Sequence, residues 1–165
     1  MRIIALMLVL NIFGVLNAQN QTTKKEVLSI FKETLVKSRN FVPEATNEWF
    51  FDNTNNDYSK KDTIILNSAR SFKRDYCKII NWSFYSNNKF VLEKTDECNE
   101  PPTKLVSKNK DSINIKIKEL NNATYLNLYN IKGLFETYRI LSLKTNKTSD
   151  QDNTFDYTLK LLRIE

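Results

Sequence analysis

Cys77 and Cys98 are the residues whose type and spacing most clearly indicate chemistry in this sequence. Between them lie two apolar-rich runs, Lys78–Ser86 and Lys89–Asp96, separated by the pair Asn87-Asn88. Because asparagine tolerates positive φ, this pair can form a two-residue hairpin turn of the primed type. Counting outward from that turn places the two cysteines opposite each other in a non-hydrogen-bonded pair, with Cα atoms about 4.5 Å apart. The spacing predicts a disulfide bond and therefore an oxidising compartment.

The same register predicts which side chains of this hairpin share a face. Trp82 and Phe84 would lie on one face with Glu93, and Tyr85 and Phe90 would lie on the other. We expect the bulkier face, with Trp82, to point inward. Trp82 would then pair with Glu93 across the strands, and a buried carboxylate would need a hydrogen-bond donor or a ligand group beside it.

Several kinds of catalytic chemistry are excluded by composition. The sequence has no histidine, which removes Ser-His-Asp and Cys-His catalysis and histidine-ligated zinc. Gly133 is the only glycine after Gly14, so no phosphate-binding glycine loop is present. The segment Asp52–Asp57 lacks the glycine and final glutamate of a calcium loop. We therefore expect no cofactor, no metal and no enzymatic activity. A hydrolase that uses two carboxylates remains an alternative, although no pair stands out.

Aromatic side chains are the distinctive surplus of the chain. Tyr125 and Tyr129 lie on a shared strand face, as do Trp82 and Phe84. Such residues either pack a core or line an apolar cavity that has a few polar groups. For the second case, the predicted ligand-binding residues are Trp82, Phe84, Glu93, Tyr125 and Tyr129.

The N-terminal segment has the pattern of a secretory signal. Arg2 precedes the apolar run Ile3–Leu16, and Asn17-Ala18 is followed by polar residues. We predict that residues 1–18 are a signal peptide cleaved after Ala18. The apolar run is shorter than the roughly 20 residues that span a bilayer, so no membrane span is expected after cleavage. The predicted location is secreted or periplasmic.

One helix is predicted, over Thr23–Ser38. Its apolar residues recur with helical spacing, and Thr23 with Glu26 fits a capping box. The apolar face consists of Val27, Ile30, Phe31 and Leu35. The segment Phe41–Lys61 is irregular, and its triplet Trp49-Phe50-Phe51 either plugs the core or starts a strand.

From Asp62 onward, the hydrophobic period changes to two, as in β-strands. We expect a polar loop over Lys144–Asn153, before the last strand. The sequence predicts a mainly β fold, an antiparallel up-and-down meander or barrel of seven or eight strands with one N-terminal helix. Residues 19–61 would carry the helix and the irregular segment, and residues 62–165 the barrel, in a single domain. The predicted strands are Thr63–Asn67, Cys77–Ser86, Lys89–Asp96, Thr103–Ser107, Ser112–Leu120, Ala123–Ile131, Leu134–Leu143 and Phe155–Ile164.

The charge balance is mildly basic. The 25 Lys and Arg residues exceed the 19 Asp and Glu residues, which gives a formal net charge of +6. No dense basic cluster appears, because the cations alternate with polar and acidic residues along the strands. This pattern is typical of solvated faces, and no nucleic-acid partner is expected.

The segment Cys77–Pro102 carries a resemblance to a known group of proteins. With Asn81-Trp82, Phe90 and the run Cys98–Pro102, followed by alternating hairpins, it resembles the small secreted lipocalin-like proteins of Bacteroidetes bacteria. The resemblance covers roughly Asp62 to Glu165 and implies a β-barrel. It favours a binding protein for a small apolar or amphipathic ligand. The alternative is a secreted protein–protein interaction module with a filled barrel and no small ligand, which binds through a sheet face or through Trp49–Phe51.

Overall fold

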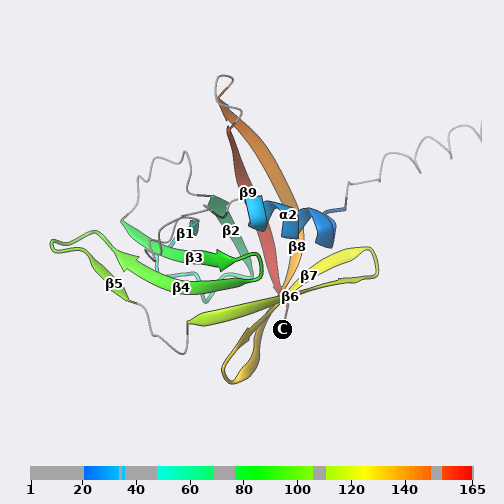
Figure 1. Cartoon of the computed structure of the whole chain (residues 1–165). Coiled ribbons are helices and arrows are strands. Elements are labelled where there is room, and N and C mark those ends of the chain that lie inside the picture. Colours follow the sequence, from blue (N-terminus) through cyan, green and yellow to red (C-terminus); the bar gives the residue numbers. More distant parts are fainter. Residues whose placement is uncertain are drawn as a thin grey trace, which may run out of the picture.

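The computed structural model describes residues 21–33, 35, 48–68, 77–105, 111–149 and 154–164. These residues form a closed antiparallel barrel of eight strands, with one helix and one additional short strand (Figure 1). The predicted fold class is confirmed. The predicted signal peptide lies outside the described residues. The elements are α2 (Lys24–Glu33), β1 (Glu48–Asp52), β2 (Thr63–Ser68), β3 (Lys78–Ser86), β4 (Lys89–Asp96), β5 (Thr103–Leu105), β6 (Ser112–Leu120), β7 (Ala123–Asn130), β8 (Gly133–Ser149) and β9 (Thr154–Ile164).

The order of strands around the ring is β3-β1-β2-β9-β8-β7-β6-β4, and the pairing of β3 with β4 closes it. From β6 to β9 each strand pairs with the next one in sequence, as in an up-and-down meander. The first strands depart from that order, because β1 lies between β2 and β3 and is antiparallel to both. β2 therefore runs in the same direction as β3 and pairs with β9 on its other side.

The aromatic triplet Trp49-Phe50-Phe51 forms a strand and also contributes to the core, so both alternatives left open by the sequence hold. It lies in β1, where Trp49 and Phe51 belong to the core and Phe50 is buried on the other face. β1 is therefore one of the eight strands that form the closed ring. β5, which is shorter than the predicted Thr103–Ser107, pairs only with the end of β4 and lies outside the ring.

The β3–β4 hairpin turns at Asn87-Asn88 as predicted, but its register differs from the prediction by one residue. A bulge at Tyr85 shifts the ladder, so that Trp82 lies opposite Leu92 and not opposite Glu93. Neither asparagine has a positive φ, so the turn is not of the primed type. Other two-residue turns match the right-handed twist of the strands poorly, and a bulge restores that twist.

The Cys77–Cys98 disulfide is present, with the Cα atoms 4.9 Å apart. In the shifted register, Glu97 lies opposite Cys77 and its backbone N–H donates to the Cys77 carbonyl at 2.7 Å. Cys98 follows the ladder, and its N–H donates to the Asp96 carboxylate at 3.0 Å. The predicted disulfide is thus confirmed, although the two cysteines do not occupy a paired ladder position.

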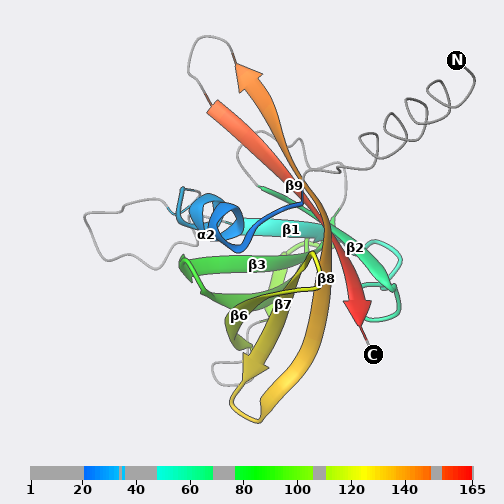
Figure 2. The ribbon, with the colours of Figure 1, turned by 90° about the vertical axis from the view of Figure 1, so that its right-hand side faces the viewer.

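β8 and β9 are longer than predicted. The prediction of a loop over Lys144–Asn153 is wrong for most of that segment, because it belongs to β8. β8 continues to Ser149 and pairs with β9 as far as Thr154. The ladder depends on backbone groups, so polar side chains such as Thr145 and Asn146 do not interrupt it. The resulting two-stranded ribbon projects beyond the barrel, at the top of Figure 2.

α2 lies across one end of the barrel. Near its start, the Lys24 N–H donates to Glu119 of β6 at 2.6 Å, and at its end Glu33 accepts a 2.8 Å bond from the Tyr157 hydroxyl of β9. Because β6 and β9 lie on different sides of the ring, the helix spans the opening. Its buried side chains are those of Val27, Ile30 and Phe31.

The start of α2 is capped as the sequence predicts. The Thr23 Oγ1 accepts a 3.2 Å bond from the Glu26 N–H, and the Glu26 carboxylate accepts a 3.3 Å bond from the Thr23 N–H. Of the predicted helix Thr23–Ser38, residues 34 and 36–38 lie outside the described residues. Leu35 packs against the core, in agreement with the predicted apolar face.

Candidate functional site

The interior of the barrel is filled with packed side chains. Trp82 is 0% exposed and Phe84 is 3% exposed, so both point inward as predicted. The Trp82 indole stacks on Phe90 with ring centroids 4.5 Å apart, and the Phe84 ring lies 4.5 Å from Phe31 of α2. Phe31 also meets Trp49 edge-on at 5.6 Å. Among the described residues these rings pack on one another in the barrel interior, which favours the filled barrel over the ligand-holding barrel.

The end of the barrel opposite α2 is closed by the loop between β1 and β2, residues 53–62. Tyr58 of this loop reaches into the barrel, where its hydroxyl accepts a 2.9 Å hydrogen bond from the Trp82 Nε1–H. Its ring meets Phe51 edge-on with centroids 5.4 Å apart. Asn53 Oδ1 accepts a 3.1 Å bond from the Tyr58 N–H, which folds the loop around the inserted ring.

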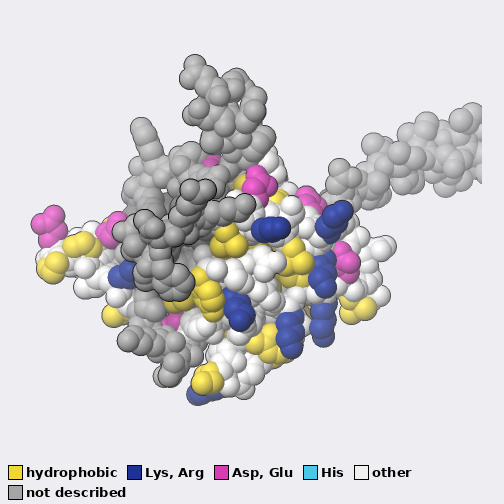
Figure 3. Space-filling view, in the orientation of Figure 1, with side chains coloured by type: hydrophobic (Ala, Val, Ile, Leu, Met, Phe, Trp, Pro, Cys, Tyr) yellow, Lys and Arg dark blue, Asp and Glu magenta, His cyan; other side chains and the backbone are white. Residues whose placement is uncertain are grey.

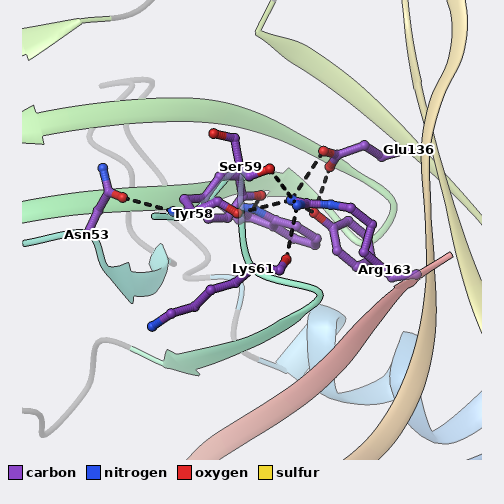
Figure 4. A network of polar contacts seen from close by, with 8 residues as sticks. Asn53, Tyr58, Ser59, Lys61, Glu136 and Arg163 are labelled. Carbon is purple, nitrogen blue, oxygen red and sulfur yellow. Dashed lines mark hydrogen bonds and ion pairs between the residues drawn. The ribbon is translucent and has the colours of Figure 1, made fainter. Parts of the chain in front are cut away.

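Arg163 of β9 holds this loop against the barrel (Figure 4). Its Nη1 donates to the backbone carbonyls of Ser59, at 2.9 Å, and Lys61, at 3.0 Å. Its Nη2 donates to the Tyr58 carbonyl at 3.1 Å. One planar guanidinium thus fixes three carbonyls of a single loop, a geometry that a lysine ammonium does not match.

Two residues of β8 complete this network. The Tyr138 hydroxyl accepts a 3.0 Å bond from Arg163 Nη2 and donates a 2.7 Å bond to Glu136 Oε2. Glu136 Oε1 lies 3.4 Å from Arg163 Nη2, so the two form a partly buried ion pair. The loop is therefore bound to β8 as well as to β9.

The pKa values of Tyr58, Tyr138 and Arg163 are all raised, which favours the protonated form of each group. Burial, followed by the charge of Glu136, raises the pKa of Tyr58. Burial also raises the pKa of Tyr138, with further contributions from Tyr58 and Glu136. Burial lowers the pKa of Arg163, but its hydrogen bond to Tyr138 and the Glu136 charge outweigh this effect and raise it. The two hydroxyls are thus protonated and the guanidinium is charged at neutral pH, so Tyr138 and Arg163 keep the donors that their hydrogen bonds in this network require.

An open groove of about 570 Å³ lies beside the Arg163 network. Its apolar walls are Leu134, Phe135 and Ile164, which are 54%, 40% and 38% exposed. Ile131, in the turn of the same β7–β8 hairpin, is 75% exposed. We call these four residues the apolar rim. Adjoining exposed apolar side chains of this kind mark interaction sites more often than isolated ones do.

Tyr125 and Tyr129 do not line the interior. The core positions of β7 are Leu126 and Leu128, and strand alternation places the two tyrosines on the outer face. The Lys116 Nζ lies 4.5 Å from the Tyr129 ring centroid on that face. The expectation that both tyrosines share a cavity wall with the aromatic residues of β3 is therefore wrong.

Glu93 is also separated from the predicted lining. The bulge at Tyr85 moves it to the face of β4 opposite the Trp82 side, where it is 8% exposed. The Ser83 hydroxyl donates to its Oε2 at 2.6 Å, and the Lys104 Nζ lies 2.8 Å from the same oxygen. Protein groups thus satisfy this carboxylate without a ligand.

Tyr58, Glu136 and Arg163 were not predicted as a site. Tyr58 lies in a polar segment with no regular period, and Arg163 is a single cation in an apolar run at the end of β9. A cation between Leu162 and Ile164 is the one local signal, because a charge in a half-buried strand needs partners. The sequence does not indicate which residues those partners are.

Within the described residues, no helix has the length and apolar character needed to cross a membrane. The described residues also bring together no group of three Cys, Asp or Glu side chains that could hold a metal ion. Comparisons with known protein families, curated proteins and solved structures found no match for this chain. The function must therefore be argued from the surface and the core themselves.

Proposed function

We propose that this chain is an extracytoplasmic binding protein that recognises a protein partner through its outer surface. The observation that carries this proposal is the filled barrel, closed at one end by Phe31 of α2 and at the other by Tyr58. The Cys77–Cys98 disulfide and the predicted signal peptide support a location outside the cytoplasm.

The apolar rim is the surface that best fits a partner. Its four side chains are at least 38% exposed. Three of them line one groove, and Ile131 lies in the β7–β8 turn at the same end of the barrel. Phenylalanine is enriched at protein interfaces, so Phe135 is the rim side chain that best fits an interface. Trp49–Phe51 is not an alternative surface, because all three residues are buried in β1.

A small apolar or amphipathic ligand in the groove is the second candidate. A volume of about 570 Å³ falls in the range of small-molecule sites, roughly 300–1,000 Å³. This candidate keeps the proposed likeness to lipocalin-like proteins but moves the ligand from the barrel interior to the rim. The groove is open on one side, which favours the protein partner over an enclosed small molecule.

Site-specific photo-crosslinking tests the protein partner. A photoreactive phenylalanine analogue is placed at Phe135 in the rim and, as a control, at Ile65, which is 46% exposed on β2. In the cells that make the protein, we expect one discrete protein adduct from Phe135 and none from Ile65. Leu134→Asp should abolish the Phe135 adduct. Equal adducts from both positions, or none from Phe135, would contradict the proposal.

Native mass spectrometry of the protein purified from the same cells separates the two candidates. A small molecule that is retained by the unaltered protein and lost from Leu134→Asp would favour the second candidate. The first candidate predicts no retained small molecule and favours a co-purifying protein that is lost from Leu134→Asp.

A further inference from the structure

The outer face of β6, β7 and β8 gathers exposed cations around two tyrosines. Lys118 lies opposite Tyr125, and Tyr125 lies opposite Arg139, so these three side chains form one row across the strands. Lys116 lies in the next row and Tyr129 in the row after it. Both lysines and the arginine are exposed, and the two tyrosines are half-buried. We call these five residues the basic face.

No carboxylate lies at the described outward positions of the basic face. The outward positions of the three strands over residues 114–118, 125–129 and 137–139 hold only Asn, Lys, Tyr, Thr and Arg. In the described part of the chain, neither Lys118 nor Arg139 forms an ion pair. In Figure 3, several Lys and Arg side chains lie along β6 and over α2, with a few Asp and Glu side chains beside those near α2. The positive potential of this surface is therefore available to an anionic partner.

The tyrosines give this face the chemistry of an interface. The Tyr129 ring holds the Lys116 ammonium at 4.5 Å, which restricts the lysine and so lowers the entropy lost on binding. Tyrosine and arginine are enriched at protein interfaces, and Tyr125 lies directly beside Arg139.

The basic face is continuous with the apolar rim. Tyr129 of the basic face, on β7, pairs with Leu134 of the apolar rim, on β8, so the two surfaces meet at this cross-strand pair. A single partner lying across this pair would contact both surfaces.

We propose that the partner presents an acidic protein surface to the basic face, next to an apolar patch that covers the rim. This inference rests on the proposed function and specifies the chemistry of its partner. A protein fits better than a nucleic acid or an anionic membrane, because those bind denser clusters of about four to eight cations. Here three cations are spaced by neutral side chains, such as Tyr125 between Lys118 and Arg139.

The charge of the partner is tested with poly-L-glutamate as the probe. The triple variant Lys116→Gln, Lys118→Gln, Arg139→Gln should weaken its binding about tenfold at low ionic strength, and salt should remove most of the binding. The matched control changes three exposed lysines outside β6, β7 and β8, by Lys32→Gln, Lys60→Gln and Lys94→Gln. This control alters the net charge equally and should weaken binding less than about twofold.

Three results would overturn the inference. They are equal weakening by the two triple variants, no binding of poly-L-glutamate, and tighter binding of heparin, single-stranded DNA or phosphatidylserine vesicles through the same residues. The yield of the crosslink from Phe135 distinguishes failure of this inference from failure of the proposed function. If its yield falls in the basic-face variant but not in the control, the inference is supported. If the yield is unchanged in both, the partner binds the rim and the acidic surface is excluded.

Discussion

The indole Nε1–H of Trp82 donates a 2.9 Å hydrogen bond to the hydroxyl of Tyr58, and this bond joins the centre of the core to the loop that closes the barrel. The loop residues 53–62 are therefore part of the packed structure. A molecule entering from this end would have to break that bond and displace the carbonyls held by Arg163.

Tyr58→Phe should destabilise the protein by about 1–3 kcal/mol, because it leaves the buried Trp82 N–H without an acceptor. Urea unfolding measures this change. Tyr85→Phe is the matched control, since Tyr85 is 54% exposed and its hydroxyl contacts only Ser112 at the surface. We expect the control to change stability by less than about 0.5 kcal/mol. Equal losses of unfolding free energy in the two variants would show that the Tyr58–Trp82 hydrogen bond does not stabilise the fold.

Arg163→Lys should loosen the loop, because a lysine cannot bind the three carbonyls together. Trypsin cleavage after Lys60 and Lys61 measures the opening, and we expect the rate to rise about tenfold or more. The control is Arg139→Lys, a replacement at an exposed arginine on the outer face. Similar cleavage rates in the two variants would contradict the role assigned to Arg163.

Phe31→Ala should cost about 3–5 kcal/mol, because it removes the ring that packs on Trp49 and Phe84 and leaves a cavity. The variant should also bind more of a hydrophobic dye than the unaltered protein does. Phe135→Ala, at a rim residue that is 40% exposed, should change stability by less than about 0.5 kcal/mol. Dye binding by the unaltered protein that persists in Leu134→Asp, and so does not occur in the rim groove, would argue against a filled barrel.

The Cys77–Cys98 disulfide closes a loop with a sequence separation of 21. In the chain-entropy model, such a closure contributes about 3 kcal/mol, so Cys77→Ser with Cys98→Ser should lower the unfolding free energy by that amount. Thiol titration of the denatured, unreduced protein should detect no free thiol. Two reactive thiols would refute the disulfide.

Alkaline pH should destabilise the fold. The pKa values of Tyr58 and Tyr138 are raised above the ordinary tyrosine value by burial, so the folded state binds their protons more tightly than the unfolded state does. Their contribution is complete below about pH 10 and is lost as the pH rises above that value. The unfolding free energy of Tyr138→Phe should decline less steeply in this range. Parallel pH profiles for the two proteins would exclude the effect.

Regular alternation and turn chemistry made much of the barrel predictable. Ile113, Ile115 and Ile117 are all buried in β6, as their period of two indicates. Asn121 and Asn122 have φ values of 49° and 56°, so the β6–β7 turn uses the tolerance of asparagine for positive φ. Local sequence was sufficient in these places because neighbouring residues determine the conformation.

The register of the β3–β4 hairpin was not predictable in the same way. Both faces carry apolar residues, so the pattern does not penalise a shift of one residue. The bulge at Tyr85 lets Trp82, Phe84 and Phe90 share the core, where they meet α2 and β1. That choice depends on elements distant in the sequence.

The candidate site depends still more on distant contacts. Arg163 and Ser59, which share a hydrogen bond, lie 104 residues apart, and no spacing rule connects them. On β7, Tyr125 and Leu126 are both plausible core residues, and only the partners across the barrel decide that Leu126 points inward.

The seam between β2 and β9 has a consequence for how the chain folds. Thr63 lies opposite Leu162, so none of the hydrogen bonds of this seam can form until the last strand meets one near the beginning. Contacts of such long range form slowly, because a large loop must close before any bond compensates for the lost entropy. Until then β2 and β9 each present an unpaired edge beside apolar residues, which is the form most prone to pairing with another chain. The seam that completes the barrel is therefore also the point at which a partly folded chain is most exposed to aggregation.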